Sequence, residues 1–208
     1  MQMIESYSIN YLGRENLLVY FHGFGGDMAE NLDFQHVLAS HLDANLLEIQ
    51  AGLPSKRPRG GFAWYPISKD RRHYLKDNSL AFQMGQSLGI IGNEISLKGL
   101  EYSDVILSGR SQGALVALRI GEHIPESKAV IMLAPFYKTA GFGGNYVPKV
   151  PVIWCEAEKD EVLPEKQKNS HKELSARGAD VRTMMMKGAT HDYLNPMEAL
   201  KISKLLER

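Results

Sequence analysis

The chain has 208 residues, and its 24 basic side chains balance its 24 acidic ones, so its formal net charge is zero. A neutral chain has no sequence-independent attraction for nucleic acid, and the single cysteine, Cys155, excludes an internal disulfide and a multi-thiolate metal site. The first ten residues lack a signal-peptide pattern, and the longest apolar run, 129–136, is too short to cross a bilayer. We expect a cytoplasmic protein with one domain over residues 1–208 and no integral membrane contact; its oligomeric state cannot be predicted.

Short runs rich in Val, Ile and Leu alternate along the chain with longer amphipathic runs. The short runs predict strands at Leu17–Phe21, Asn45–Gln50, Tyr102–Ser108, Lys128–Ala134, Val150–Glu156 and Val181–Met186, with an additional edge strand at Ile4–Asn10. The longer runs predict helices at Met28–His41, Ser79–Lys98, Gln112–His123, Glu165–Arg177 and Met197–Leu206. Such alternation is typical of an α/β protein, with helices on both faces of a mostly parallel sheet.

Two segments, 51–78 and 135–149, have no clear period. Each leaves the carboxyl end of a predicted strand, the edge where open α/β sheets bind ligands, so we expect both to lie over that edge. Residues 53–78 hold seven basic and two acidic side chains. We expect Arg71 and Arg72 in this segment to attract anionic substrates; the alternative is that they are solvated charges on a loop.

The motif Gly109-Arg-Ser-Gln-Gly113 lies between a predicted strand and a predicted helix. A serine on a sharp strand-to-helix turn is exposed above the sheet, and the strained backbone brings strand and helix so close that flanking side chains would collide. Glycines two positions either side of Ser111 fit this requirement. The pattern predicts a nucleophilic serine; the alternative is a glycine-rich turn with an exposed serine.

A serine hydroxyl needs a general base, and the base needs an orienting acid. Of the seven histidines, only His191 follows a predicted strand after a short turn and precedes the last helix, which predicts it at the same sheet edge as Ser111. Asp160 follows the strand before it and gives the chain order nucleophile, acid, base that is typical of this architecture. Glu158 is the rival for the acid.

The acyl oxyanion needs two backbone donors. One is predicted to be the N–H of Gln112, next to Ser111 at the helix start. The other is predicted to be the N–H of Phe24, in the glycine-rich segment 22–26 that follows the first strong strand. That segment lacks the ending of a P-loop and the spacing of a dinucleotide fingerprint, so nucleotide binding is disfavoured.

Together these motifs resemble the phospholipase/carboxylesterase family of α/β-hydrolases, the group that includes acyl-protein thioesterases. The resemblance covers nearly the whole chain, through His22–Gly26, Gly109–Gly113, Asp160–Pro164, His191–Asp192 and Ala63–Ile67. It implies a single α/β-hydrolase domain without a large cap domain, a Ser-Asp-His triad, no cofactor or metal, and hydrolysis of carboxylic esters or thioesters. The chain departs from the family pattern at Arg110, Ala114, Ala157 and Thr190, where an aromatic residue and three glycines are usual.

We therefore interpret the chain as a serine carboxylesterase acting on small-molecule or lipid-like acyl esters. Four aromatic residues in segments that leave the predicted ligand edge are expected to line the acyl site: Phe24, Trp64, Tyr65 and Phe136. For Trp64 the alternative is that it anchors its loop in the core. Two other functions stay open: an amide or peptide hydrolase with the same triad, and a non-catalytic binding protein on the same fold.

Overall fold

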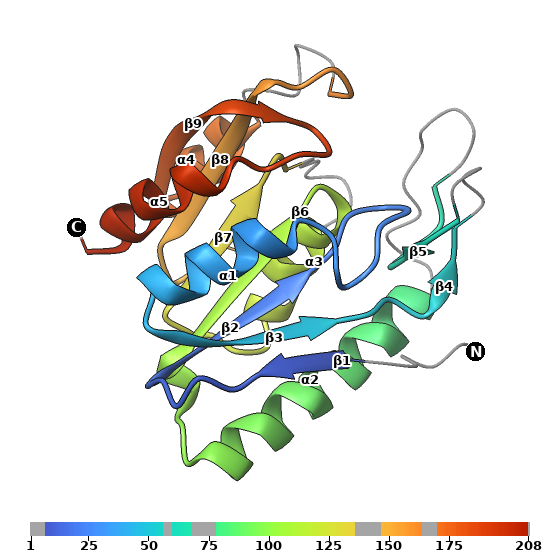
Figure 1. Cartoon of the computed structure of the whole chain (residues 1–208), viewed down its shortest axis with the longest axis vertical. Helices are drawn as coiled ribbons and strands as arrows, with labels where there is room; N and C mark the ends of the chain where they lie inside the picture. The colour runs from blue at the N-terminus through green and yellow to red at the C-terminus, as the bar shows by residue number, and fades with distance from the viewer. Residues whose placement is uncertain (1–6, 56–59, 68–77, 136–146, 164–169, 208) are drawn as a thin grey trace.

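The structure is a computed structural model that describes residues 7–55, 60–67, 78–135, 147–163 and 170–207. A seven-stranded sheet forms its centre, in the order β1-β3-β2-β6-β7-β8-β9 (Figure 1). Only β1 is antiparallel to its neighbour; the six other strands pair in parallel. The bounds of the strands are β1 Tyr7–Asn10, β2 Asn16–Phe21, β3 Ala44–Ile49, β6 Val105–Arg110, β7 Ala129–Leu133, β8 Val152–Lys159 and β9 Val181–Thr190.

The helices alternate with the strands, as the sequence predicts. Their bounds are α1 Leu32–His41, α2 Asn78–Lys98, α3 Gln112–Gly121, α4 His171–Ala176 and α5 Ala199–Leu206, with 3-10 turns η1 at Tyr102–Asp104 and η4 at Pro196–Glu198. Two short strands, β4 Leu53–Pro54 and β5 Phe62–Ala63, form a separate antiparallel pair.

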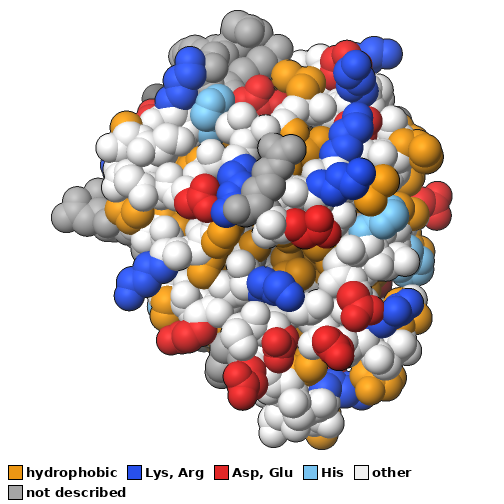
Figure 2. All heavy atoms as spheres, turned by 90° about the vertical axis from the view of Figure 1, so that its left-hand side faces the viewer, with side chains coloured by type: hydrophobic (Ala, Val, Ile, Leu, Met, Phe, Trp, Pro, Cys, Tyr) orange, Lys and Arg blue, Asp and Glu red, His pale blue; other side chains and the backbone are white. Residues whose placement is uncertain are grey.

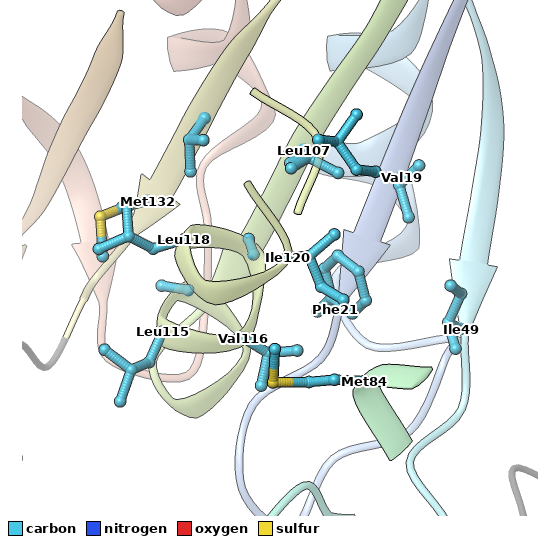
Figure 3. Packing of buried hydrophobic residues seen from close by; sticks show 14 of the residues in the cluster. Val19, Phe21, Ile49, Met84, Leu107, Leu115, Val116, Leu118, Ile120 and Met132 are labelled. Carbon is cyan, nitrogen blue, oxygen red and sulfur yellow. The ribbon is translucent and has the colours of Figure 1, made fainter. Parts of the chain in front are cut away.

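Each face of the sheet has its own hydrophobic core. On one face Leu107 and Val19 belong to the same cluster of buried side chains as Leu115 of α3 and Met84 of α2 (Figure 3). On the other face Leu18 and Ile106 share a second buried cluster with Phe34 of α1 and Ile202 of α5. Successive side chains of a strand point to opposite faces, so the near-continuous apolar runs of β2 and β6 fill both cores at once. The expected mostly parallel sheet with helices on both faces is thereby confirmed.

The order of strands reverses at the centre of the sheet. From β2 the chain adds β3 on one side and then crosses to β6 on the other, so that β2 and β6 are neighbours that point the same way. In open α/β sheets the ligand crevice lies at the carboxyl ends of the strands at such a switch point. The glycine segment 22–26 follows β2, and the glycine motif 109–113 spans the end of β6 and the start of α3.

Several predicted boundaries differ from those in the structure. The helix expected from Met28 begins at Leu32, because Asn31 has left-handed backbone angles (φ 54°) that no α-helix continues through. The strand expected from Tyr102 begins at Val105, after η1. The strand expected to end at Met186 continues to Thr190, so the short turn expected before His191 is absent.

On the face in Figure 2, basic and acidic side chains are interspersed with small hydrophobic patches, as a neutral chain allows. None of the helices in the described ranges is long and apolar enough to span a membrane.

Candidate active site

Ser111 occupies a strained turn between β6 and α3. Its backbone angles are φ 50° and ψ −109°, a conformation that L side chains rarely adopt. A Cβ atom on Gly113 would lie well under 3.0 Å from the carbonyl oxygens of Phe21 and His22, and one on Gly109 would collide with the backbone of Gly113. The steric reason predicted for both glycines is therefore confirmed: strand and helix backbones meet with no room for a side chain.

The pairing of β8 and β9 brings an acid and a base together at the same sheet edge. After a register shift the two strands pair at Lys159 and Thr190, the last residue of each. Asp160 and His191 are the next residues, so they leave adjacent strand ends side by side. The extension of β9 to Thr190 does what the short turn was expected to do.

Ser111, His191 and Asp160 form a continuous chain of hydrogen bonds. His191 Nε2 lies 2.9 Å from Ser111 Oγ, and His191 Nδ1 lies 2.8 Å from Asp160 Oδ2. Because a carboxylate only accepts, we assign the Nδ1–H tautomer, which leaves Nε2 as the acceptor that faces the serine hydroxyl. The side chains of His191 and Asp160 are each 4% exposed, whereas Ser111 is half-buried and open to solvent.

The carboxylate of Asp160 is held in its charged form. Burial alone would raise its pKa, but the hydrogen bond from His191 and those from the backbone N–H groups of Leu163 and Val162, both 2.9 Å long, bring the pKa below its ordinary value. The rival carboxylate of Glu158 is exposed and accepts from the N–H of Gly188 at 2.9 Å instead. The geometry thus favours Asp160 as the partner of the imidazole.

The glycine-rich segment 22–26 follows β2 directly beside this turn. Phe21 pairs in register with Gly109, and the backbone of Phe21 and His22 touches the start of α3 at Gly113. Phe24 lies half-buried in this segment, and Gln112 is the first residue of α3. The first N–H groups of a helix have no intrahelical acceptor, so the N–H of Gln112 is a donor at the turn that carries Ser111.

The buried side chain of His22 holds the same segment in place through hydrogen bonds. Its ring accepts a hydrogen bond at Nε2 from the N–H of Ala51 (3.0 Å), which requires the proton on Nδ1, where the acceptor is the oxygen of Gly23 at 2.8 Å. Burial lowers the pKa of His22, and a second proton on Nε2 would break the bond to Ala51. His22 is therefore a neutral structural side chain.

Trp64 and Tyr65 do not line an open site, contrary to the sequence-based expectation. Both side chains are completely buried. Trp64 Nε1 donates to the His22 oxygen at 2.9 Å, and its ring packs edge-on against Phe21. Burial of a bulky aromatic ring in the core stabilises the fold more than leaving it at a solvated edge does. The alternative, that Trp64 anchors its loop, is the arrangement the structure has.

The side chain of Gln112 has a structural role that the sequence did not reveal. Its Oε1 accepts from the N–H of Trp64 at 2.9 Å, and its Nε2 donates to the oxygen of Tyr65 at 2.8 Å. Gln83 of α2 completes the anchor, because its Nε2 donates to the oxygen of Trp64 at 2.9 Å. Two buried amides therefore fix the loop beside Ser111.

The remaining predicted substrate-binding residues, Phe136, Arg71 and Arg72, lie outside the described residues. Among the described residues, no group of three or more His, Cys, Asp or Glu side chains could hold a metal ion.

Comparison with known proteins decides the family. The sequence profile described as phospholipase/carboxylesterase matches residues 11–205. The chain belongs to the phospholipase/carboxylesterase family.

Solved structures share its fold. The chain is similar to a carboxylesterase from Mesorhizobium loti (TM-score 0.76, 19% identity, 97% of this chain and 93% of that one). It is also similar to esterase PE8 (TM-score 0.76, 22% identity, 93% and 92%) and to the Bacillus cereus carboxylesterase (TM-score 0.75, 15% identity, 97% and 92%). A search of curated proteins gives no match.

Three side chains that sequence reasoning did not assign to the site, Arg110, Glu30 and Asn31, connect its parts in this member of the family. Arg110, noted only as a departure from the pattern, donates to the backbone oxygen of His191 at 2.6 Å and forms an ion pair with Glu30. Nearby, Asn31 accepts from the N–H of Leu194 at 2.8 Å. A motif at residue 110 gives no signal of a partner 80 positions away in sequence, so Glu30 could not be found from the sequence.

Proposed function

We propose that this family member is a serine carboxylesterase, with Ser111 as nucleophile, His191 as general base and Asp160 as the orienting acid. The observation that carries the proposal is the continuous hydrogen-bond chain from Asp160 through His191 to the strained Ser111. The three groups come from the ends of three different strands. A glycine-rich turn without a catalytic role would not need a base and an acid aligned beside its serine, whereas nucleophilic catalysis does.

The reaction follows from the donors and acceptors present. Ser111 Oγ attacks the acyl carbon while its proton passes to His191 Nε2, and the negative charge of Asp160 stabilises the imidazolium. The backbone N–H groups of Gln112 and Phe24 are proposed to bind the oxyanion, aided by the positive end of α3. His191 then protonates the leaving alcohol or thiol. In the second half, His191 activates a water molecule that releases the acid and restores Ser111.

We propose small-molecule or lipid-like acyl esters as substrates, and the test is a hydrolysis profile. Purified protein is assayed on p-nitrophenyl esters of two to twelve acyl carbons, an acyl thioester, and the p-nitroanilide matched to the best ester. We expect turnover of esters at least about 10³-fold above the anilide, since the amine is the poorer leaving group. Faster anilide cleavage would make the protein an amidase, and no turnover of any compound would make it a binding protein.

A further inference from the structure

Arg110, the residue before Ser111, reaches into a polar junction that it forms with Glu30 and the backbone oxygen of His191. Arg110 points to the face of β6 that α1 and α5 cover, and its side chain is 4% exposed. Its Nε donates to the carboxylate of Glu30, which is 12% exposed, and its Nη1 donates to the oxygen of His191 at 2.6 Å and to Asp192 Oδ1 at 2.9 Å.

Glu30 connects this junction to the segment proposed to bind the oxyanion. Its second oxygen accepts from the N–H of Gly23 at 3.2 Å. Gly23 also lies directly against the guanidinium, where a Cβ atom would come within 2.8 Å of Arg110 Cζ. A larger residue at position 23 would therefore require the guanidinium to shift away from this position.

The three segments that carry the proposed nucleophile, base and oxyanion donor thus meet at one ion pair. Burial alone would lower the pKa of Arg110, but the carboxylate of Glu30 raises it above its ordinary value. The guanidinium therefore keeps its charge, as an arginine side chain in a protein does.

We propose that Arg110 and Glu30 are a positioning pair, which fixes the backbone of His191 and of Gly23 relative to Ser111. This inference rests on the proposed function. A buried ion pair gives little net stability over apolar side chains of similar volume, so stability alone does not explain its presence. Its donors do fix the main chain from which the imidazole extends, and a misplacement of about 1 Å at reacting groups costs on the order of 10²-fold in rate.

The test compares four variants on the best ester. The double variant Arg110→Met/Glu30→Gln removes the guanidinium while leaving no unpaired buried charge, and an amide oxygen at position 30 can still accept from Gly23. Arg110→Met and Arg110→Lys are measured beside it. The control is Arg182→Met, because Arg182 also pairs with a carboxylate, Asp180, and donates to a carbonyl, that of Leu205, but at the amino end of β9.

For the double variant we expect kcat to fall about 10–100-fold with KM within about twofold, the range found when groups that orient functional side chains are removed. The rate of labelling by a fluorophosphonate should fall in parallel, and Arg110→Lys should recover part of both. Arg182→Met should lower the melting temperature without changing kcat. A folded double variant with kcat within twofold of wild type overturns the inference, as does an equal kcat loss in Arg182→Met.

Ser111→Ala is assayed in parallel to separate the two proposals. If Ser111→Ala keeps the activity, the proposed function fails and the positioning role fails with it. If Ser111→Ala is inactive while the double variant is unchanged, only the positioning role fails.

Discussion

Glu158, in β8, and Asp160, directly after β8, lie two residues apart in the sequence but contact different groups. Asp160 contacts His191 Nδ1, and Glu158 contacts the N–H of Gly188. We expect Asp160→Asn to lower kcat by about 10³–10⁴-fold, because an amide favours the wrong imidazole tautomer. Glu158→Gln is the matched control and should change kcat less than about threefold. Ester hydrolysis measures both, and the reverse result would assign the orienting role to Glu158.

The variant Trp64→Ala distinguishes a core role for Trp64 from a place in the acyl site. Its buried indole fills core volume between Phe21 and His22, so Trp64→Ala should lower the free energy of unfolding by about 3–5 kcal/mol. The ratio of rates for short and long acyl esters should stay within about twofold at a temperature where the variant is folded. Urea denaturation and the ester series measure these two quantities. A shifted chain-length preference with unchanged stability would return Trp64 to the substrate site.

At the residue scale, the local glycine pattern predicted the strained turn at Ser111, and the chain order predicted that Asp160 and His191 lie beside it. The spacing of Gly109, Ser111 and Gly113 predicts the strained turn because backbone sterics are local. The direction in which a buried side chain points is not local. Aromatic residues after a strand look alike in sequence whether they line a site or fill the core, so Trp64 and Tyr65 were placed wrongly.

At the scale of elements, the contact between β2 and the start of α3 sets the site. Gly113→Ala places a methyl group against the carbonyl oxygens of Phe21 and His22, so strand and helix must separate. We expect a loss of about 1–3 kcal/mol in the free energy of unfolding, as for other overpacked sites, and a fall in kcat of at least about tenfold because the segment 22–26 moves.

Gly89→Ala is the control for that variant. Gly89 is an exposed residue of α2 with open space where a Cβ would lie, so alanine should raise the stability by about 0.5–1 kcal/mol and leave kcat unchanged. Thermal melts and ester assays measure both variants. Equal stability changes at positions 89 and 113 would contradict the close approach of β2 and α3.

Element types followed from the sequence more closely than element ends did. The apolar runs of β2, β6 and β7 are buried on both faces, and such runs are visible in any sequence. The end of β9 is not visible, because the continuation to Thr190 depends on a register shift against β8. The start of α1 is set by Asn31, which has left-handed backbone angles. Its side chain accepts a hydrogen bond from the N–H of Leu194, three residues after His191, and makes no capping bond to its own helix.

At the scale of the whole molecule, a buried carboxyl on β3 should make the stability depend on pH. Burial, with a smaller contribution from Asp27, raises the pKa of Glu48 from 4.5 to about 7. Between these values the folded state holds a proton that the unfolded chain has released, so the free energy of unfolding falls as pH rises from about 4.5 to 7. Above this window the carboxylate is charged in both states and the loss is complete.

Glu48→Gln should remove that loss. We expect the stability gained by the variant over wild type to be larger at pH 8 than at pH 5 by on the order of 2 kcal/mol. Urea denaturation at the two pH values measures the gain. A gain that is the same at both values would mean that Glu48 does not titrate in this window.

Covalent labelling of the intact protein tests the central claim, that Ser111 is an activated nucleophile, most directly. Wild-type protein is treated with a fluorophosphonate, and the adduct is located by mass spectrometry of its peptides. The proposal predicts one adduct per chain, on Ser111, with loss of ester hydrolysis in step with labelling and neither adduct nor turnover in Ser111→Ala, whose rate should fall by on the order of 10⁶. Labelling at another residue, or turnover by Ser111→Ala within tenfold of wild type, would contradict it.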